Sequence, residues 1–209
     1  KEEPRQQSGP DRDSEPFYGV DVDALTPGKA VTIDPTVPGF PVASLSKLPA
    51  GDYYVQGMLL PYTRFKRSDG HTIWAHMDAG EGQRFNASPG SLVSEVQKVH
   101  IDPARKAAPV SLSLTKTIPA VPAAQETEWV KRFRITSKLA STFWGHPMSL
   151  GAVVLLPKGY AENTTKRYPV VYWLFGYEQT DEKRDREIAD YAASRGVIVV
   201  EAGPIETTG

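Results

Sequence analysis

A run of large apolar residues that ends at a glycine constrains this chain more than any other segment. Residues 170–175 read Val-Val-Tyr-Trp-Leu-Phe, and Gly176 and Tyr177 follow them. Pro169 restricts the backbone where the run begins, and consecutive large apolar side chains are typical of a strand covered on both faces. The segment therefore predicts a buried strand that ends in a tight turn, which is where sheets of this kind place function.

The neighbouring segments predict further strands and one helix. Residues 132–139 alternate between polar and apolar at first, and residues 150–156 form a near-continuous apolar run that suits a covered strand. Thr180 is a candidate N-cap, because acidic residues follow it in the first turn, where the helix dipole favours negative charge. The apolar stripe of the helix consists of Ile188, Tyr191 and Ala192. Gly196 should end the helix, and residues 197–200 should form the next strand.

Two of these segments resemble motifs of the α/β-hydrolases. Residues 155–160, Leu-Leu-Pro-Lys-Gly-Tyr, and the run from Tyr168 to Gly176 resemble the "LPxGY" and "YPVLYLLHG" motifs of the branch that includes esterase D and the enterochelin esterases. The resemblance covers roughly residues 130 to 205. It implies that the turn after the strand supplies a backbone N–H to an oxyanion hole, at Gly176 or Tyr177, with Phe175 as a wall facing the substrate. Phe175 stands where the family has histidine, a change that a main-chain donor survives. The alternative is a strand-to-helix turn without chemistry.

The catalytic residues of such an enzyme are absent from the sequence. Hydrolases of this fold carry a serine in a Gly-x-Ser-x-Gly elbow, followed by an acid and a histidine. No such pentapeptide occurs in the 209 residues. Ser149 comes closest, but Pro147 occupies the position of the first glycine, so we interpret Ser149 as a residue at the start of a strand. We therefore expect no catalytic residue in this chain, and we expect the complete protein to hydrolyse carboxylic esters.

The resemblance also implies that the strand at 170–175 lies at an edge, because its outer neighbour would belong to the missing part of the domain. An apolar edge strand tends to pair with another chain. We therefore expect the protein to dimerise, to aggregate or to require a complementary polypeptide.

Composition excludes several classes of partner and cofactor. The formal net charge is −1 with both signs interspersed, which argues against nucleic acid and against an anionic membrane surface. No stretch of apolar residues is long enough to cross a membrane, and we expect no cofactor. Cysteine is absent, which excludes disulfides and thiolate metal sites. The absence of cysteine fits an exported bacterial protein or a cytosolic one. Of these we expect a secreted or periplasmic location, although the sequence carries no targeting segment.

The front of the chain predicts a β-sandwich of immunoglobulin type over residues 17–117, after a loose tail at 1–16 and before a linker at 118–128 and the hydrolase-like part at 129–209. Short strand-like runs separated by turns are typical of such sandwiches. We expect these strands at 17–22, 29–33, 52–60, 71–76, 92–101 and 110–117. Residues 48–55, Leu-Pro-Ala-Gly-Asp-Tyr-Tyr-Val, resemble the start of a late sandwich strand, where a tyrosine ties the corner.

Other candidate sites are weaker. His71 and His76 lie five residues apart, a spacing that points to opposite faces of a strand, so we expect no metal site. His146 is expected at the surface without a partner. The aromatic residues of the front region could form a flat platform for a sugar or an aromatic ester, although core packing is the commoner use. These residues are Tyr53, Tyr54, Tyr62, Phe65 and Trp74. The alternative function is accordingly a non-catalytic β-sandwich that binds carbohydrate or protein.

Overall fold

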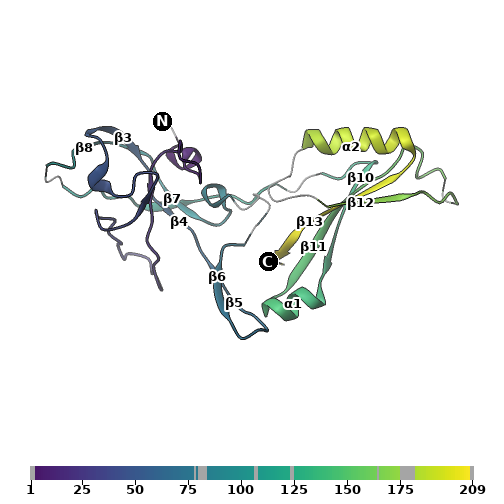
Figure 1. Ribbon diagram of the computed structural model, residues 1–209, viewed down its shortest axis with the longest axis horizontal. Coiled ribbons are helices and arrows are strands. Elements are labelled where there is room, and N and C mark those ends of the chain that lie inside the picture. The colour runs from purple at the N-terminus through teal and green to yellow at the C-terminus, as the bar shows by residue number, and fades with distance from the viewer. Residues whose placement is uncertain are drawn as a thin grey trace. The chain divides into compact units, whose positions relative to one another are not determined.

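The computed structural model describes residues 3–77, 79, 84–105, 108–122, 125–163, 165–174 and 182–207, with side chains omitted at 182–186 and 202–207. Strands dominate these residues and helices are few, so the protein is β-rich (Figure 1). The chain divides into two compact units. The first comprises Lys1–Leu60 and Gly90–Ile118, and the second comprises Pro61–Pro89 and Pro119–Gly209.

Short antiparallel strands make up the first unit. They are β1 (Phe17–Tyr18), β2 (Gly39–Phe40), β3 (Gly51–Val55), β4 (Met58–Leu59), β7 (Leu92–Ser94), β8 (Gln97–Ile101) and β9 (Leu114–Thr117). β1 pairs with β2, β3 pairs with β8, and β7 lies between β4 and β9. The 3-10 turn Leu45–Lys47 precedes β3, and another such turn, Phe85–Ala87, belongs to the second unit.

Several expected strands of the first unit are shorter or divided. The strand expected at 29–33 is absent, and the one expected at 110–117 begins only at Leu114. The two long strands expected at 52–60 and 92–101 each divide into two. The divisions lie where Gly57 and Ser94 exchange hydrogen bonds: Gly57 N donates to Ser94 Oγ at 2.9 Å, and Ser94 N donates to Gly57 O at 2.9 Å. A side chain that bonds the backbone in this way competes with the regular ladder.

The expected tyrosine tie at the start of β3 is confirmed. Tyr53 Oη donates a hydrogen bond of 2.6 Å to the carbonyl oxygen of Pro49, across the turn that leads into the strand. Tyr53 is also the Cα partner of Val99 in the ladder between β3 and β8. The hydroxyl therefore fixes the turn, and the ladder fixes the register of the strand that follows.

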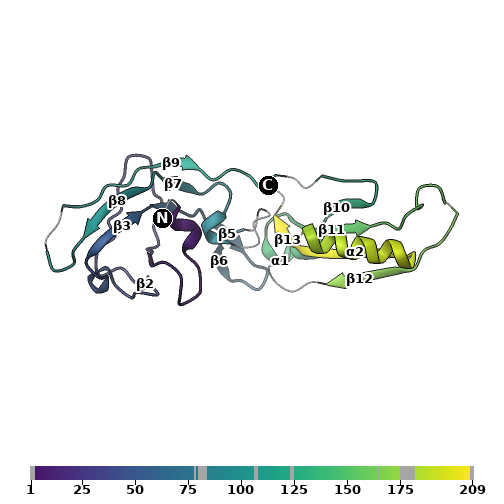
Figure 2. The ribbon, with the colours of Figure 1, turned by 90° about the horizontal axis from the view of Figure 1, so that it is seen from above.

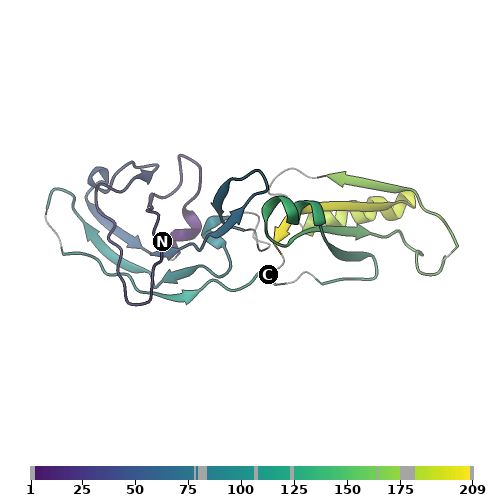
Figure 3. The same cartoon turned by 90° about the horizontal axis from the view of Figure 1, so that it is seen from below.

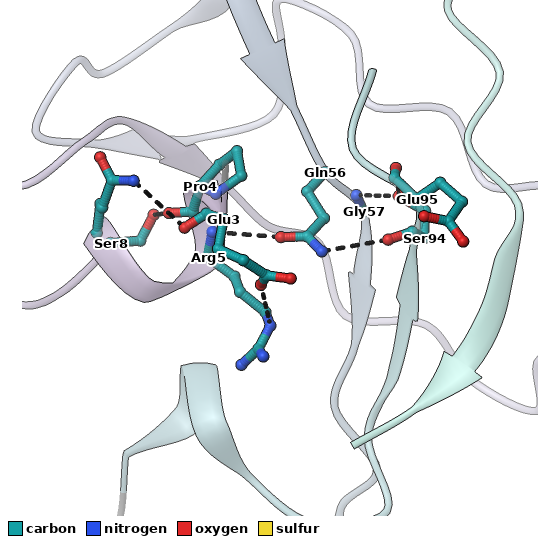
Figure 4. A network of polar contacts seen from close by, with 9 residues as sticks. Glu3, Pro4, Arg5, Ser8, Gln56, Gly57, Ser94 and Glu95 are labelled. Atoms are coloured by element: carbon teal, nitrogen blue, oxygen red, sulfur yellow. Dashed lines mark hydrogen bonds and ion pairs between the residues drawn. The ribbon is translucent and has the colours of Figure 1, made fainter. Parts of the chain in front are cut away.

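Residues 3–16, expected as a loose tail, instead carry a 3-10 turn at Pro4–Gln7 that bonds to the first unit (Figure 4). Arg5 N donates to Gln56 Oε1 at 3.4 Å, and Gln56 Nε2 donates to Ser94 O at 3.2 Å. Within the turn, Arg5 Nε lies 3.0 Å from Glu3 Oε2. Gln56 therefore links the main chain of this segment to the carbonyl of Ser94, a contact that the composition of residues 1–16 could not reveal.

The second unit contains a hairpin and a four-stranded sheet. The hairpin joins β5 (Thr63–Lys66) to β6 (Thr72–Ala75). The sheet follows in the order β10 (Val130–Thr136), α1 (Lys138–Trp144), β11 (Met148–Leu155), β12 (Val170–Leu174), α2 (Glu182–Arg195) and β13 (Ile198–Thr207). Side by side, the strands run β10-β11-β13-β12, with β11 antiparallel to β10 and β13, and β12 parallel to β13.

Helix α1 was not expected from the sequence. Ser137 caps it, because its side-chain oxygen accepts a hydrogen bond of 3.2 Å from Ala140 N. Gly145 ends it in the left-handed region at φ 62°. A Cβ atom at this glycine would also collide with the carbonyl oxygen of Lys66 in β5. The strand alternation expected to continue to residue 139 therefore stops at Thr136.

Helix α2 covers one face of the sheet (Figure 2). The core between helix and sheet consists of Ala192 of α2, Leu155 of β11 and Val199 of β13, which are at most 2% exposed. Ile188 packs against this core as expected, whereas Tyr191, expected on the same stripe, is exposed. The helix ends before Gly196 as the sequence predicts, and the strand expected at 197–200 extends to Thr207. The candidate cap Thr180 lies outside the described residues.

In the part of the chain that the structure describes, no helix covers the opposite face of the sheet except at its end, where α1 lies (Figure 3). By alternation and register, this face carries Phe133 and Ile135 of β10 with Val170, Tyr172 and Leu174 of β12, all of them exposed. The prediction of a strand at 170–175 covered on both faces is therefore wrong in its burial, because β12 lies at the edge of the sheet, where even Val171 and Trp173, on the face of α2, are exposed at 42% and 48%. The expected edge position is confirmed: among the described residues, β12 pairs only with β13.

The hairpin belongs to the second unit, whereas the sequence suggested that residues 17–117 form one domain. Its contacts explain the difference, because Ser68 N donates a hydrogen bond of 2.7 Å to Phe143 O, the carbonyl of a residue in α1. The end of the first unit at Ile118 lies where the linker is expected to begin.

Candidate functional site

A site of the predicted kind would lie at one end of the four-stranded sheet. β12 and β13 are parallel and therefore end toward the same edge, where the antiparallel β11 begins and β10 ends. We call this end of the sheet, which consists of strand ends and is distinct from the edge strand β12, the carboxyl edge. Leu174 is paired with Ala202, and Met148 with Thr207. Ligands of open α/β sheets bind beyond the carboxyl ends of the parallel strands.

The predicted oxyanion and wall residues follow directly after β12. Leu174 is the last residue of this strand, and Phe175, Gly176 and Tyr177 lie outside the described residues. The direction in which their N–H groups point is thus not described. What the structure describes is the strand that leads to them and the elements that share the carboxyl edge with its end, α1 and the start of β11.

A cluster of rings forms where the β5–β6 hairpin meets α1. Phe65 of β5 is 1% exposed, and its ring centroid lies 5.7 Å from that of Trp144 and 5.7 Å from that of His146. Phe143 stands edge-on to Trp144 at 5.2 Å. Such tilted ring pairs add stability beyond the area they bury. His146, expected at the surface without a partner, is therefore held against Phe65.

The tip of the hairpin clamps the same helix through a cation. The guanidinium of Arg67 lies 4.9 Å from the ring centroid of Phe143 and 5.7 Å from that of Trp144, and it pairs with Asp69. The pKa of Asp69 is lowered, chiefly by the hydrogen bond from His71 N, while the His71 ring and Arg67 add to the effect. The clamp thus combines ring stacking with a carboxylate that stays charged in neutral solution.

An apolar cavity of about 170 Å³ lies between the hairpin, α1 and the start of β11. Its lining consists of Phe65, Ile73, Ala75, Met77, Trp144 and Met148. The sequence analysis missed this cavity. The signal for half of it is the alternation in the hairpin, which puts Phe65, Ile73 and Ala75 on one face, but nothing in the sequence reveals that α1 and β11 complete the wall.

A second, shallow hollow also lies beside α1. It is lined by Thr136, Lys138, Ser141, Thr142, Gly145, His146 and Pro147. Ser141 is committed to structure there, because its Oγ accepts a hydrogen bond of 2.9 Å from Met148 N. His146 Nδ1 lies 3.2 Å from the carbonyl oxygen of its neighbour Pro147. These contacts fix α1 on β11 and do not pair His146 with an acid or a nucleophile.

Ser149 is confirmed as a strand residue. It is the second residue of β11 and fully buried, and its Oγ has no hydrogen-bond partner among the described residues. A nucleophilic serine must project from a sharp turn toward solvent. Ser149 meets neither condition, so it is not a nucleophile.

The other candidate side chains serve separate contacts. Nδ1 of His71 lies 3.2 Å from Asp69, that of His100 lies 2.8 Å from Asp52, and the His76 ring bonds Ser88. No group of three or more metal-ligating residues occurs among the described residues. In the aromatic set, Phe65 is buried and Tyr53 bonds Pro49, so these two are not part of a platform, whereas the rings of Tyr54, Tyr62 and Trp74 are exposed.

In the part of the chain that the structure describes, no helix is both long enough and apolar enough to span a membrane. A scan against protein-family models finds no match to the chain, and a search of curated proteins finds none either.

Proposed function

We propose that residues 129–209 are the first part of an esterase-like α/β-hydrolase domain that follows an immunoglobulin-like β-sandwich, and that a polypeptide beyond these 209 residues supplies the nucleophile, the acid and the histidine. The observation that carries the proposal is β12. This strand is wholly apolar, lies at an edge parallel to β13, and exposes every one of its five residues. The edge position is what the resemblance to the esterase D branch implies.

The composition and exposure of β12 indicate that another element covers this strand in the complete domain. A stable edge strand is normally protected by charges, proline, a bulge or a covering element. β12 contains no charge and no proline, and two of its side chains, Tyr172 and Leu174, are exposed at 74% and 79%. A further parallel strand beside β12 and a helix on the open face would bury these groups, as in the complete domains that the motifs resemble.

The proposed chemistry is hydrolysis of a carboxylic ester without a cofactor. A serine oxygen supplied by the completing polypeptide attacks the carbonyl carbon, while a histidine accepts the serine proton and passes it to the leaving alcohol. The main-chain N–H groups of Gly176 and Tyr177 stabilise the oxyanion, and Phe175 forms a wall of the site. Water then releases the acid from the acyl-enzyme. We propose a secreted or periplasmic location and a small-molecule ester as substrate.

The decisive experiment extends the protein through the codons that follow Gly209 in its gene and assays the product on p-nitrophenyl esters. We expect hydrolysis by the extended protein and none by the 209-residue chain. Replacement of the serine in a newly included Gly-x-Ser-x-Gly by alanine should abolish the activity. A gene that encodes no such elbow after Gly209, or an extended protein that leaves the esters intact, would refute the proposal.

A second candidate function is binding of carbohydrate or protein without catalysis. One observation favours it: Trp74 in β6 is 62% exposed and lies directly opposite the exposed Arg64 of β5. A flat ring beside a cation can stack on a sugar and pair with its acidic group. Gel retardation by an acidic polysaccharide, lost in Trp74→Ala and kept in Tyr54→Ala, would support this function instead.

A further inference from the structure

The apolar cavity between the β5–β6 hairpin and β11 carries an inference that rests on the proposed function. We infer that this cavity binds the apolar acid half of the substrate, a group of the size of one aromatic ring. The protein would then act on esters of small aromatic or short acyl acids.

Volume and lining decide the class of ligand. The cavity measures about 170 Å³, and all six residues that line it are apolar. A cavity of about 150 Å³ lined by apolar side chains stays dry and binds benzene. The space is partly open to solvent, and its apolar lining offers water few hydrogen-bond partners, whereas a ring or a short acyl chain can pack against it. Met77 and Met148 have flexible side chains that can adjust to the outline of such a group.

Position in the fold connects the cavity with the proposed chemistry. Met148 is the first residue of β11 and is paired with Thr207 at the end of β13, whereas β12 stops earlier, at Leu174 opposite Ala202, and runs toward this end of the sheet. The expected oxyanion residues, Gly176 and Tyr177, follow β12 at this edge. An acyl group held at the start of β11 would extend from the side of the sheet on which an ester carbonyl must bind.

The hairpin wall of the cavity is held firmly in place. Ser68 N donates to Phe143 O at 2.7 Å, and Arg67 lies over the Phe143 ring at 4.9 Å. Gly145 allows the backbone of Lys66 to approach the end of α1. These contacts fix the hairpin on α1, so the space between them keeps its outline.

Methionine methyl groups provide a direct test on the 209-residue chain. The sequence contains three methionines, of which Met77 and Met148 line the cavity and Met58 lies in β4 of the first unit. With ¹³C-methyl methionine, titration with benzene should shift the signals of Met77 and Met148 and leave that of Met58 in place. Glucose, a polar ring, should shift none of them. Equal shifts at Met58, or no shift at Met77 and Met148 up to the solubility limit of benzene, would overturn the inference.

Filling the cavity should abolish binding. Ala75→Leu adds three carbon atoms to the lining and should weaken benzene binding at least about tenfold, whereas Ala193→Leu, the same change at an exposed position of α2, should leave it unchanged. Should Ala75→Leu fail to fold, Ile73→Ala enlarges the cavity and should admit naphthalene, which the unaltered chain excludes. Benzene binding that survives Ala75→Leu, or exclusion of naphthalene from Ile73→Ala, would contradict the assignment.

The two proposals fail separately. If the extended protein hydrolyses no ester while benzene still shifts Met77 and Met148, the esterase function falls and the binding cavity remains. If the extended protein hydrolyses esters but Ala75→Leu leaves its preference among benzoate, butyrate and acetate esters unchanged, the function stands and this cavity is not its acid pocket.

Discussion

The two faces of the four-stranded sheet in the second unit both carry apolar residues but differ in burial. On the face beneath α2, Leu155 and Val199 of the inner strands are at most 2% exposed, and Val171 and Trp173 of the edge strand β12 are exposed at 42% and 48%. On the opposite face, Tyr172 and Leu174 are exposed at 74% and 79%. The difference shows that an apolar strand is buried only where another element packs on it. In the described residues, only one face has such an element along the length of the sheet.

The open face is closed at one end, and this end shows what a cover requires. The β5–β6 hairpin brings Phe65 to the start of β11, where Met148 is buried. The hairpin lies far from β11 in the sequence, and hydrogen bonding, ring stacking and a cation hold it there. A cover for the rest of the face would need a comparable set of contacts.

The strongest test of the comparison removes the same side chain from each face. Leu155→Ala should lower the free energy of unfolding by about 4 kcal/mol, because it leaves a cavity in a packed core. Leu174→Ala removes a mostly exposed side chain and should cost less than about 1 kcal/mol. Urea unfolding monitored by circular dichroism measures both. Equal losses would mean that the open face is covered in solution.

A second pair of variants compares the two faces of the hairpin. Phe65→Ala removes a buried ring and should lower the free energy of unfolding by about 3 kcal/mol. Trp74→Ala, on the exposed face of the same hairpin, should cost well under that amount. Thermal unfolding of both variants provides the measurement. A larger loss in Trp74→Ala would show that the outward face carries the packing.

The open edge and face should make the chain associate. We expect light scattering to show dimers or larger species, and we expect Leu174→Lys to raise the dissociation constant at least about tenfold, because a charge on an edge strand opposes pairing. Leu139→Lys is the control, since Leu139 is exposed on α1 and lies outside the sheet. A monodisperse monomer before any substitution would show that β12 is tolerated as a free edge.

In the first unit, the hydroxyl of Tyr53 ties the turn before β3, and its removal tests how much that tie stabilises the unit. Tyr53→Phe removes the hydrogen bond to Pro49 O and should lower the free energy of unfolding by about 1 kcal/mol. Tyr54→Phe removes the hydroxyl of the neighbouring residue, which is exposed, and should change stability by a few tenths of a kcal/mol at most. Chemical denaturation distinguishes them, and indistinguishable variants would remove the corner tie from the account.

The smallest expected effect concerns an exposed carboxylate in β3. The pKa of Asp52 is lowered by hydrogen bonds from His100 and then Lys98, with the charge of Lys98 adding to the effect. Because the folded-state pKa is depressed, the stabilisation is complete above the ordinary pKa near 3.8 and is lost as the pH falls through the lower folded value. An NMR titration of the carboxyl carbon should show this pKa rising in His100→Gln. An unchanged pKa in that variant would assign the shift to another cause.

Much of the local structure could be predicted from the sequence. The Pro-Ala-Gly turn and Tyr53 predicted the turn that leads into β3, and Gly196 predicted the end of α2. Predictions failed where local signals were outweighed by distant contacts. Residues 3–16 are rich in charge and proline, yet Gln56 holds their 3-10 turn, and the strand expected to reach residue 139 gives way to α1, whose C-terminal Gly145 fits against Lys66.

For the candidate site, too, one part could be predicted from the sequence and another could not. The predicted site residues were found from the motifs, since Phe175, Gly176 and Tyr177 come directly after the apolar strand. The apolar cavity could not be predicted, because its six lining residues come from distant segments. Three belong to the β5–β6 hairpin, Met77 follows shortly after it, and the other two belong to α1 and β11. No local pattern relates such distant segments, so their meeting depends on the packing of the whole unit.

The sequence by itself determined where the apolar strand ends, that α2 stops before Gly196, and that no serine elbow lies within the 209 residues. Only the tertiary structure decided that β12 is exposed along its whole length, and that a hairpin from the front of the chain forms a wall of a cavity at the start of β11. The physical reason is that propensity and turn chemistry act between near neighbours, whereas burial is set by whichever distant segment packs against a surface.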